Sequence, residues 1–286
     1  MSETKSLERF INLRDATGKT IYLEVTNGKI SKIADKEDLA ASLSNFRTID
    51  GAGRTIIPGL VDLHTHLREP GNEDSETVLS GSQAACAGGY TAVSAMANSF
   101  PVADTAGVVE QVFRLGKTHG LCDVFPVGAI TLGLKGEQLS EMSAMNRSEA
   151  GTRIFSDDGK CVANALIMRR ALEYVKIFDG LIAQHAQDPL LTLDSQMNEG
   201  LVSAKLGLKG WPAVAEEAII ARDILLADHV QSKLHICHVS TAGSVEIIRW
   251  AKQRGFHLTC EVTPHHLLLT EELVESYNPI YKVNPP

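Results

Sequence analysis

The chain has 286 residues, of which 44% are hydrophobic, so it is long and apolar enough to bury one large core. Its formal charge of −8 excludes a basic footprint for nucleic acid or for an anionic membrane. It has no stretch of about eighteen uncharged apolar residues and no signal-like N-terminus. Five scattered cysteines without a C-x-x-C pair favour reduced thiols over a disulfide framework. We therefore expect a globular, cytoplasmic protein of enzyme size that binds neither nucleic acid nor membrane.

Residues 1–55 are predicted to form a small β-rich domain. Residues 21–26 and 29–33 have the composition of two strands, and Asn27-Gly28 lies between them. An Asn-Gly pair favours the tight turn that joins antiparallel strands. We expect a hairpin here.

From residue 56 to residue 286, apolar strand-like runs alternate with longer helical patterns, which is typical of βα units around a parallel sheet. Seven such runs are visible, at residues 56–63, 91–96, 124–130, 153–155, 181–183, 234–239 and 258–262. The pattern indicates an α/β fold, a TIM-like (β/α)₈ barrel beside the small N-terminal β domain. Because such a barrel needs eight strands, we expect this domain to be truncated at the C-terminus and to lack its eighth strand.

One helix is predicted over residues 214–230, where an apolar stripe faces a charged side. The stripe is expected to consist of Ala218, Ile219, Ala221, Ile224, Leu225 and Ala227. The water-facing side is expected to consist of Glu216, Glu217, Arg222 and Asp223.

The first predicted barrel strand ends in two histidines, His64 and His66, with only Thr65 between them. Alternate side chains of a strand point to the same face, so both imidazoles can lie on one side while Thr65 points away. Imidazole nitrogens at the carboxyl end of a buried strand suit zinc or a similar transition metal. The alternative is that two histidines lie at a strand end by chance, because such a short motif has false positives.

Polar side chains also follow several other predicted strands, at the end of a barrel where enzymes place their active sites. Together with the first pair, the residues that could meet there are His64, His66, Asp158, His185 and His238. Four imidazoles and a carboxylate suit two divalent metals, whose chemistry generates hydroxide at neutral pH. Each residue alone has a simpler interpretation, such as an Asp-Gly turn at 157–159 or a hydrogen-bonded core histidine at position 185.

Three other histidines are set aside. In a regular strand, His235 and His238 cannot both face inward, and we choose His238 because it is nearer the strand end. His265 and His266 are adjacent, so their side chains diverge, and we assign neither to a metal.

Arg68 and Asn98 are candidates for substrate binding. Arg68 lies two residues beyond His66, where its guanidinium could bind a substrate carboxylate through two hydrogen bonds. Asn98 follows the second predicted strand and could add an amide donor. The alternative for Arg68 is a surface ion pair with Glu69 or Glu73, which would contribute little stability.

Four segments together resemble bacterial type I dihydroorotase, of the cyclic amidohydrolase superfamily. They are PGLVDLHTHLREPG at 58–71, SDDG at 156–159, HICHVST at 235–241 and EVTPHHLLL at 261–269. The resemblance extends from about residue 10 to the last residue. It implies a (β/α)₈ amidohydrolase barrel and the reversible, zinc-dependent cyclisation of N-carbamoyl-L-aspartate to L-dihydroorotate in de novo pyrimidine biosynthesis.

The resemblance also implies a role for each ligand, with two Zn²⁺ per chain. His64 and His66 would bind one metal, His185 and His238 the other, and Asp158 would bridge them. The substrate would be contacted by His66, Arg68, Asn98 and Asn284. As to partners, the resemblance leaves open a homodimer or an assembly with aspartate transcarbamoylase.

Some positions depart from the family pattern. Ala97 replaces a usual proline, and Ala186-Gln187-Asp188 replaces a frequent Cys-Glu-Asp. The family's last strand carries a catalytic aspartate, which nothing in these 286 residues matches. We therefore identify no catalytic residue within the chain, expect that aspartate beyond Pro286, and expect the chain as it stands to be inactive.

Two other functions are weighed against dihydroorotase. A hydantoinase or allantoinase would bridge its metals with a carboxylated lysine, for which Lys135 and Lys160 are the candidates near the fourth strand. Neither lies within that strand, so the aspartate bridge is favoured. A non-catalytic barrel acting as a scaffold for a transcarbamoylase would be marked by lost metal ligands, yet five candidate ligands are present.

Overall fold

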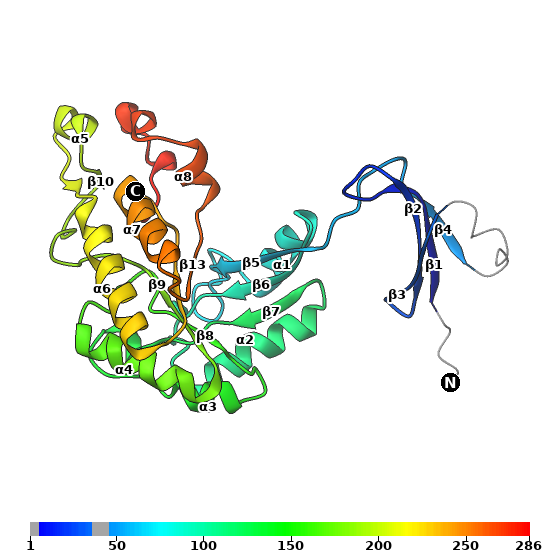
Figure 1. Ribbon diagram of the computed structural model, residues 1–286, viewed down its shortest axis with the longest axis horizontal. Helices are drawn as coiled ribbons and strands as arrows, with labels where there is room; N and C mark the ends of the chain where they lie inside the picture. Colours follow the sequence, from blue (N-terminus) through cyan, green and yellow to red (C-terminus); the bar gives the residue numbers. More distant parts are fainter. Residues whose placement is uncertain (1–5, 36–45) are drawn as a thin grey trace. The chain divides into compact units, whose positions relative to one another are not determined.

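The computed structural model describes residues 6–35 and 46–286, and the chain divides into two compact units (Figure 1). The units are Met1–Gly59 and Leu60–Pro286. The sequence pattern places the corresponding change between residues 55 and 56, four residues earlier.

The first unit contains a four-stranded sheet in the order β3-β2-β1-β4. Its strands are β1 Leu7–Arg14, β2 Thr20–Thr26, β3 Lys29–Ala34 and β4 Arg47–Asp50. Strands β2 and β3 are antiparallel and form the predicted hairpin. At its turn Asn27 and Gly28 have φ of 50° and 74°, the left-handed backbone that a type I′ turn requires.

The second unit contains the seven strands that the sequence predicts, all pairing in parallel. They are β5 Leu60–Thr65, β6 Tyr90–Ala95, β7 Asp123–Pro126, β8 Ile154–Phe155, β9 Leu181–Gln184, β12 Leu234–Ile236 and β13 Leu258–Cys260. Pairing runs β5-β6-β7 and β8-β9-β12-β13, and a parallel bridge between Gly128 and Phe155 connects the two groups. Strand β5 begins later than predicted, at Leu60; Pro58 just before it has no N–H to donate to a ladder.

Helices follow most of these strands and cover them (Figure 1). They are α1 Val78–Ala87, α2 Ala106–His119, α3 Met142–Arg147, α4 Ala165–Val175, α6 Val214–Val230, α7 Ala242–Gln253 and α8 Pro264–Leu268. Helix α6 packs between α4 and α7, and α1 packs against α2. A short excursion between β9 and α6 consists of β10 Met197–Asn198, α5 Leu201–Leu206 and β11 Gly210–Trp211. Short 3₁₀ turns occupy Leu132–Leu134, Lys176–Phe178, Glu271–Ser276 and Pro279–Tyr281.

The core of the second unit lies between the strands and the helices. Its largest fully buried apolar side chains include Phe155, Met168, Leu172, Ile220 and Ile236. Burying one such side chain stabilises the fold by about 1.5–3 kcal/mol. The strand ends that carry the candidate site are therefore anchored in a close-packed interior.

Helix α6 has the predicted bounds, but part of its predicted polar side is buried. Asp223 is fully buried and accepts hydrogen bonds from Arg222 and Gln184. Glu216 is 1% exposed and accepts from the backbone N–H groups of Ser240 and Thr241. The prediction was wrong for these two carboxylates because each finds polar partners inside the protein, whereas Leu225 of the predicted stripe is exposed.

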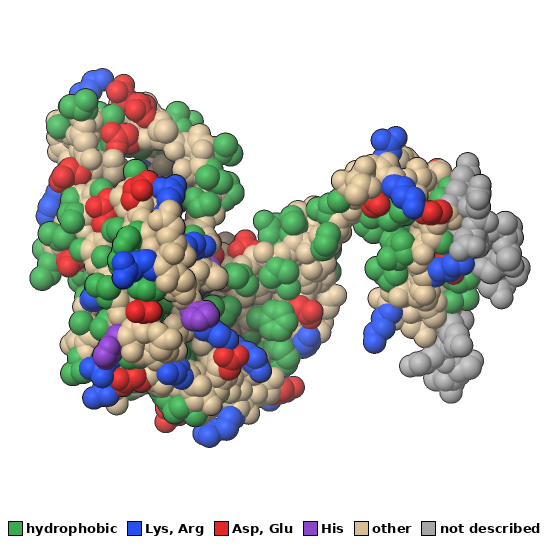
Figure 2. Space-filling view, in the orientation of Figure 1, with side chains coloured by type: hydrophobic (Ala, Val, Ile, Leu, Met, Phe, Trp, Pro, Cys, Tyr) green, Lys and Arg blue, Asp and Glu red, His purple; other side chains and the backbone are tan. Residues whose placement is uncertain are grey.

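On the face of the larger unit that Figure 2 shows, acidic and basic side chains are interspersed rather than gathered by sign. Within residues 6–35 and 46–286, no helix combines the length and apolar character needed to cross a bilayer.

Candidate metal centre

Five predicted site residues lie at or just after the carboxyl ends of the parallel strands. His64 is the next-to-last residue of β5 and His66 follows that strand directly, as His185 follows β9. Asp158 lies three residues beyond β8, and His238 lies two residues beyond β12. Because parallel strands end on the same side of the sheet, their carboxyl ends bring these side chains to one place.

All four imidazoles contact the carboxylate of Asp158. Its Oδ1 lies 3.3 Å from His64 Nε2, 3.3 Å from His185 Nδ1 and 3.2 Å from His238 Nε2. Its Oδ2 lies 3.4 Å from His66 Nε2. His185 Nδ1 and His238 Nε2 are themselves only 2.8 Å apart. The structure thus brings together the five residues that the sequence singles out.

In three of the four histidines, the ring nitrogen that points away from Asp158 lies within hydrogen-bond distance of a side-chain oxygen. His64 Nδ1 lies 2.5 Å from Glu261 Oε1, His66 Nδ1 lies 3.0 Å from Asn98 Oδ1, and His185 Nε2 lies 2.8 Å from Gln187 Oε1. An oxygen acceptor takes the N–H of a neutral imidazole, which leaves the lone pair on the other nitrogen. In the neutral form of each ring, the lone pair therefore faces Asp158.

This donor set fits a pair of metal ions. Two groups of ligand atoms each lie within 4.8 Å of one another, namely His64 with His66 and Asp158, and Asp158 with His185 and His238. Imidazole nitrogens with a shared carboxylate suit zinc and related divalent metals. Acceptors behind the rings are the usual outer partners of metal-binding histidines.

The electrostatics of the cluster attract positive charge. Burial alone would lower the pKa of His64, but its contacts with Asp158, Cys237 and Glu261 outweigh burial and raise it to about 12. Burial would raise the pKa of Asp158, yet its histidine contacts hold it well below its usual range. Burial lowers the pKa of His66 and of His238, which favours their neutral, metal-binding form.

The two aspartates at 157 and 158 have different surroundings. Asp157 points away from the histidines and accepts hydrogen bonds from the backbone N–H groups of Ile130 and Thr131, at 2.8 and 2.9 Å. It also accepts from the Thr131 hydroxyl. Burial, against these hydrogen bonds, raises the pKa of Asp157 to about 6. Asp157 thus fixes the loop after β7, and only Asp158 is available to a metal.

The arrangement of His235 differs from the expectation. A strand that continued to residue 239, as predicted, would turn His235 away from the site, but β12 ends at Ile236 and His238 has a φ of 30°. The alternation of side chains therefore stops before His238. His238 joins the Asp158 cluster, while His235 also lines the cavity and lies 3.3 Å from Glu261 Oε2.

A cavity of about 860 Å³ opens over the cluster, and the predicted substrate residues Arg68, Asn98 and Asn284 line it. Among the described residues, the Arg68 guanidinium has no hydrogen bond or ion pair. Glu69 instead accepts from the backbone of Val78, and Glu73 from that of Gly71. The surface ion pair that was the alternative for Arg68 is therefore not formed.

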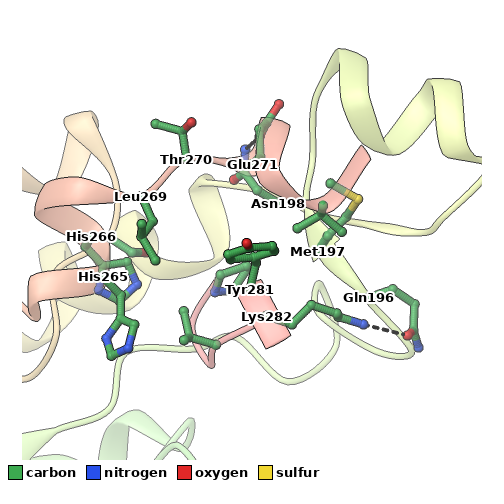
Figure 3. A pocket seen from close by; sticks show the side chains of 14 residues that line it. Gln196, Met197, Asn198, His265, His266, Leu269, Thr270, Glu271, Tyr281 and Lys282 are labelled. Carbon is green, nitrogen blue, oxygen red and sulfur yellow. Dashed lines mark hydrogen bonds between the residues drawn. The ribbon is translucent and has the colours of Figure 1, made fainter. Parts of the chain in front are cut away.

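His265 and His266 line this cavity and also a second one of about 200 Å³ beside it (Figure 3). His266 is held by Thr263 at 2.8 Å and by the carbonyl oxygen of Pro285 at 3.0 Å. In the second cavity, Lys282 donates to Gln196 across 3.2 Å. Neither histidine belongs to a group of converging ligand atoms in the described part of the chain.

The cavity does not offer a lysine, among its described residues, that could bridge two metals as a carboxylated lysine would. Lys135 and Lys160 are both exposed, and the described residues that line the cavity include no lysine. Asp158 belongs to both groups of ligand atoms.

Sequence reasoning did not assign roles to Glu261 and Gln187. Glu261 lies in the EVTPHH segment, and Gln187 lies in one of the positions that depart from the family pattern. Each meets its histidine only through the fold, since Glu261 and His64 are 197 residues apart. The signal available in the sequence was a polar residue near the end of a predicted strand for Glu261, and a polar residue shortly after a predicted strand for Gln187.

Comparisons with solved structures identify the class of fold. An L-hydantoinase (dihydropyrimidinase) from Arthrobacter aurescens superposes with a TM-score of 0.78 at 23% identity, over 98% of this chain and 63% of that one. A dihydropyrimidinase from Brevibacillus agri gives a TM-score of 0.71 at 20% identity, over 96% of this chain and 60% of that one. The chain therefore shares the α/β fold of these two structures.

Sequence comparisons identify the family. The profile described as Dihydro-orotase-like matches residues 53–244. A dihydroorotase from Streptomyces coelicolor is 69% identical over 86% of this chain and 57% of its own length. One from Mycobacterium tuberculosis is 52% identical over 94% of this chain and 62% of its own length. The chain belongs to the dihydroorotase-like family, and it spans about 60% of the length of the curated relatives it matches.

Proposed function

We propose that this chain carries the metal centre of a dihydroorotase, which interconverts N-carbamoyl-L-aspartate and L-dihydroorotate in pyrimidine biosynthesis. The observation that carries the proposal is the convergence of four imidazoles, at the ends of β5, β9 and β12, onto Asp158. Membership of the dihydroorotase-like family supports the choice of reaction.

The proposed centre holds two zinc ions. His64 and His66 bind one, His185 and His238 bind the other, and Asp158 bridges them, as the two groups of ligand atoms suggest. Zinc bound in such a site lowers the pKa of water and polarises a carbonyl oxygen. Asp158 keeps both positions close together, while Glu261, Asn98 and Gln187 fix the rings.

The proposed substrate contacts use the cavity above the metals. The free Arg68 guanidinium binds the substrate carboxylate, because a fork of N–H donors matches a carboxylate in plane and spacing. The Asn98 amide oxygen faces His66, so its NH₂ group remains available as a donor. Asn284 is exposed at the rim of the cavity and adds a polar contact.

The finer architecture is part of the same proposal. We take the seven parallel strands as seven of the eight in a (β/α)₈ barrel that accompanies a small N-terminal β domain. The proposed boundary between the two domains in the sequence falls near Gly59, where the chain divides into its two compact units.

The experiment that tests the function compares two substrates on the zinc-loaded protein extended to the full length of its curated relatives, of which this chain spans about 60%. Dihydroorotate carries a carboxylate that unsubstituted hydantoin lacks, so the proposal predicts turnover of dihydroorotate and little turnover of hydantoin. Ring opening is followed by loss of ultraviolet absorbance. Equal turnover of the two substrates, or activation that requires bicarbonate, would favour a hydantoinase with a carboxylated lysine.

Replacement of Arg68 by methionine is expected to raise the KM for dihydroorotate about 30-fold with a smaller effect on kcat. Loss of a charge-assisted pair worth about 2 kcal/mol corresponds to that factor. Steady-state kinetics of the variant check it. Arg147→Met, which removes an exposed arginine of α3, is the matched control and should leave KM unchanged. An unchanged KM in Arg68→Met would remove Arg68 from the substrate site.

A further inference from the structure

Glu261 divides its two carboxylate oxygens between two histidines. Oε1 lies 2.5 Å from His64 Nδ1, and Oε2 lies 3.3 Å from His235 Nε2. The side chain of Glu261 is 22% exposed, while those of His64 and His235 are 11% and 8% exposed. The hydrogen bond to His64 is therefore shielded from water, where a charge-assisted hydrogen bond is strongest. His235 Nε2 is also buried, and it lies at an ion-pair distance from Glu261 without making a hydrogen bond.

The backbone around Glu261 is also fixed. Its N–H donates to the carbonyl oxygen of Ile236 at 3.0 Å, and its carbonyl oxygen accepts from Val239 at 2.9 Å. His235 is held on its other nitrogen by the Thr259 hydroxyl at 2.8 Å. A continuous chain of contacts thus runs from Thr259 through His235 and Glu261 to His64.

We propose that Glu261 is a positioning residue for the metal position formed by His64 and His66, with His235 as its anchor. The inference rests on the proposed metal centre. By accepting the N–H of His64 Nδ1, Glu261 fixes the tautomer that leaves the lone pair on Nε2, and it also fixes the orientation of the ring. His235 keeps the carboxylate from rotating away.

Glu261 acts through His64 and is not a ligand of these two metals. His64 presents Nε2 to Asp158 and Nδ1 to Glu261, so a metal beside Asp158 lies on the opposite side of the ring from Glu261. A second arrangement is conceivable on distance alone, because Cys237 also lies within 4.8 Å of His64 and Glu261. The test therefore includes Cys237.

The effect of Glu261 is specific to one metal position. The acceptors behind His66 and His185 are neutral amides, those of Asn98 and Gln187. The Nδ1 atom of His238 is buried without a hydrogen-bond partner. Among the four ligand histidines, only His64 therefore has a carboxylate behind it in the described structure.

The test measures zinc affinity at each position by competition with a chromophoric chelator, on the full 286-residue chain. In Glu261→Gln, one zinc should bind about 10- to 100-fold more weakly, the usual cost of losing an outer-shell partner, while the other is unchanged. The same loss of zinc affinity should be seen when Glu261→Gln is combined with His238→Ala. It should be nearly absent when Glu261→Gln is combined with His64→Ala. His235→Gln should weaken the same position by a smaller factor.

Glu246→Gln is the matched control, since Glu246 is exposed on α7 and pairs with Arg249 of the same helix. Thermal melts establish that each variant is folded. Unchanged affinity in Glu261→Gln, or equal weakening at both positions, would overturn the proposal. A matching loss in Cys237→Ser would overturn it too, by making Glu261 a ligand alongside the thiol. If the parent chain bound no zinc, the proposed metal centre itself would be wrong. The same assay distinguishes that outcome from a failure of the Glu261 proposal alone.

Discussion

Replacement of Asp158 by alanine is expected to weaken zinc binding at both metal positions by more than about 100-fold. Loss of an outer-shell partner alone costs 10- to 100-fold, and Asp158 is a shared ligand that contacts all four imidazoles. Its removal also leaves four histidines facing one another without the carboxylate that lies among them. Chelator competition measures the affinities, and dihydroorotate turnover should be lost with the metals.

Asp157→Ala is the control for this result, because the two aspartates are adjacent and equally buried. It should leave both zinc affinities nearly unchanged but lower the free energy of unfolding. Two buried N–H groups, of Ile130 and Thr131, would lose their acceptor, at about 1–3 kcal/mol for each unsatisfied group. Should Asp157→Ala release the metals and Asp158→Ala retain them, the bridging ligand would be misassigned.

His64→Ala and His238→Ala are each expected to remove one zinc and to leave the other. The two residues belong to different groups of ligand atoms, which share only Asp158. Elemental analysis after gel filtration should give close to one zinc per chain for each variant and close to none for the double variant. The same stoichiometry as the parent chain in both single variants would contradict the site as drawn.

Much of the candidate site could be predicted because its signals are local in the sequence. His64 and His66 follow the alternation of a strand. Asp158 and His185 follow apolar runs that the structure shows as strands, and His238 lies near the end of another such run. Parallel strands then bring those ends together without further information. The Asn27-Gly28 hairpin was predictable for the same reason, since its turn depends on two adjacent residues.

What the sequence did not show depends on contacts between distant segments. The helix pattern places the charged side chains of Glu216 and Asp223 in water. In the structure both are buried and accept hydrogen bonds from residues of other segments. His235 was misplaced because β12 ends two residues before His238. Alternation along a strand cannot indicate where the strand stops or which carboxylate another strand supplies.

The most direct test of the central claim is a crystal structure of the zinc-loaded chain with anomalous diffraction measured at the zinc edge. The account predicts two peaks on either side of the Asp158 carboxylate, one beside His64 and His66 and the other beside His185 and His238. Peaks located elsewhere, such as between Cys237 and Glu261, or the absence of any peak near Asp158, would contradict it.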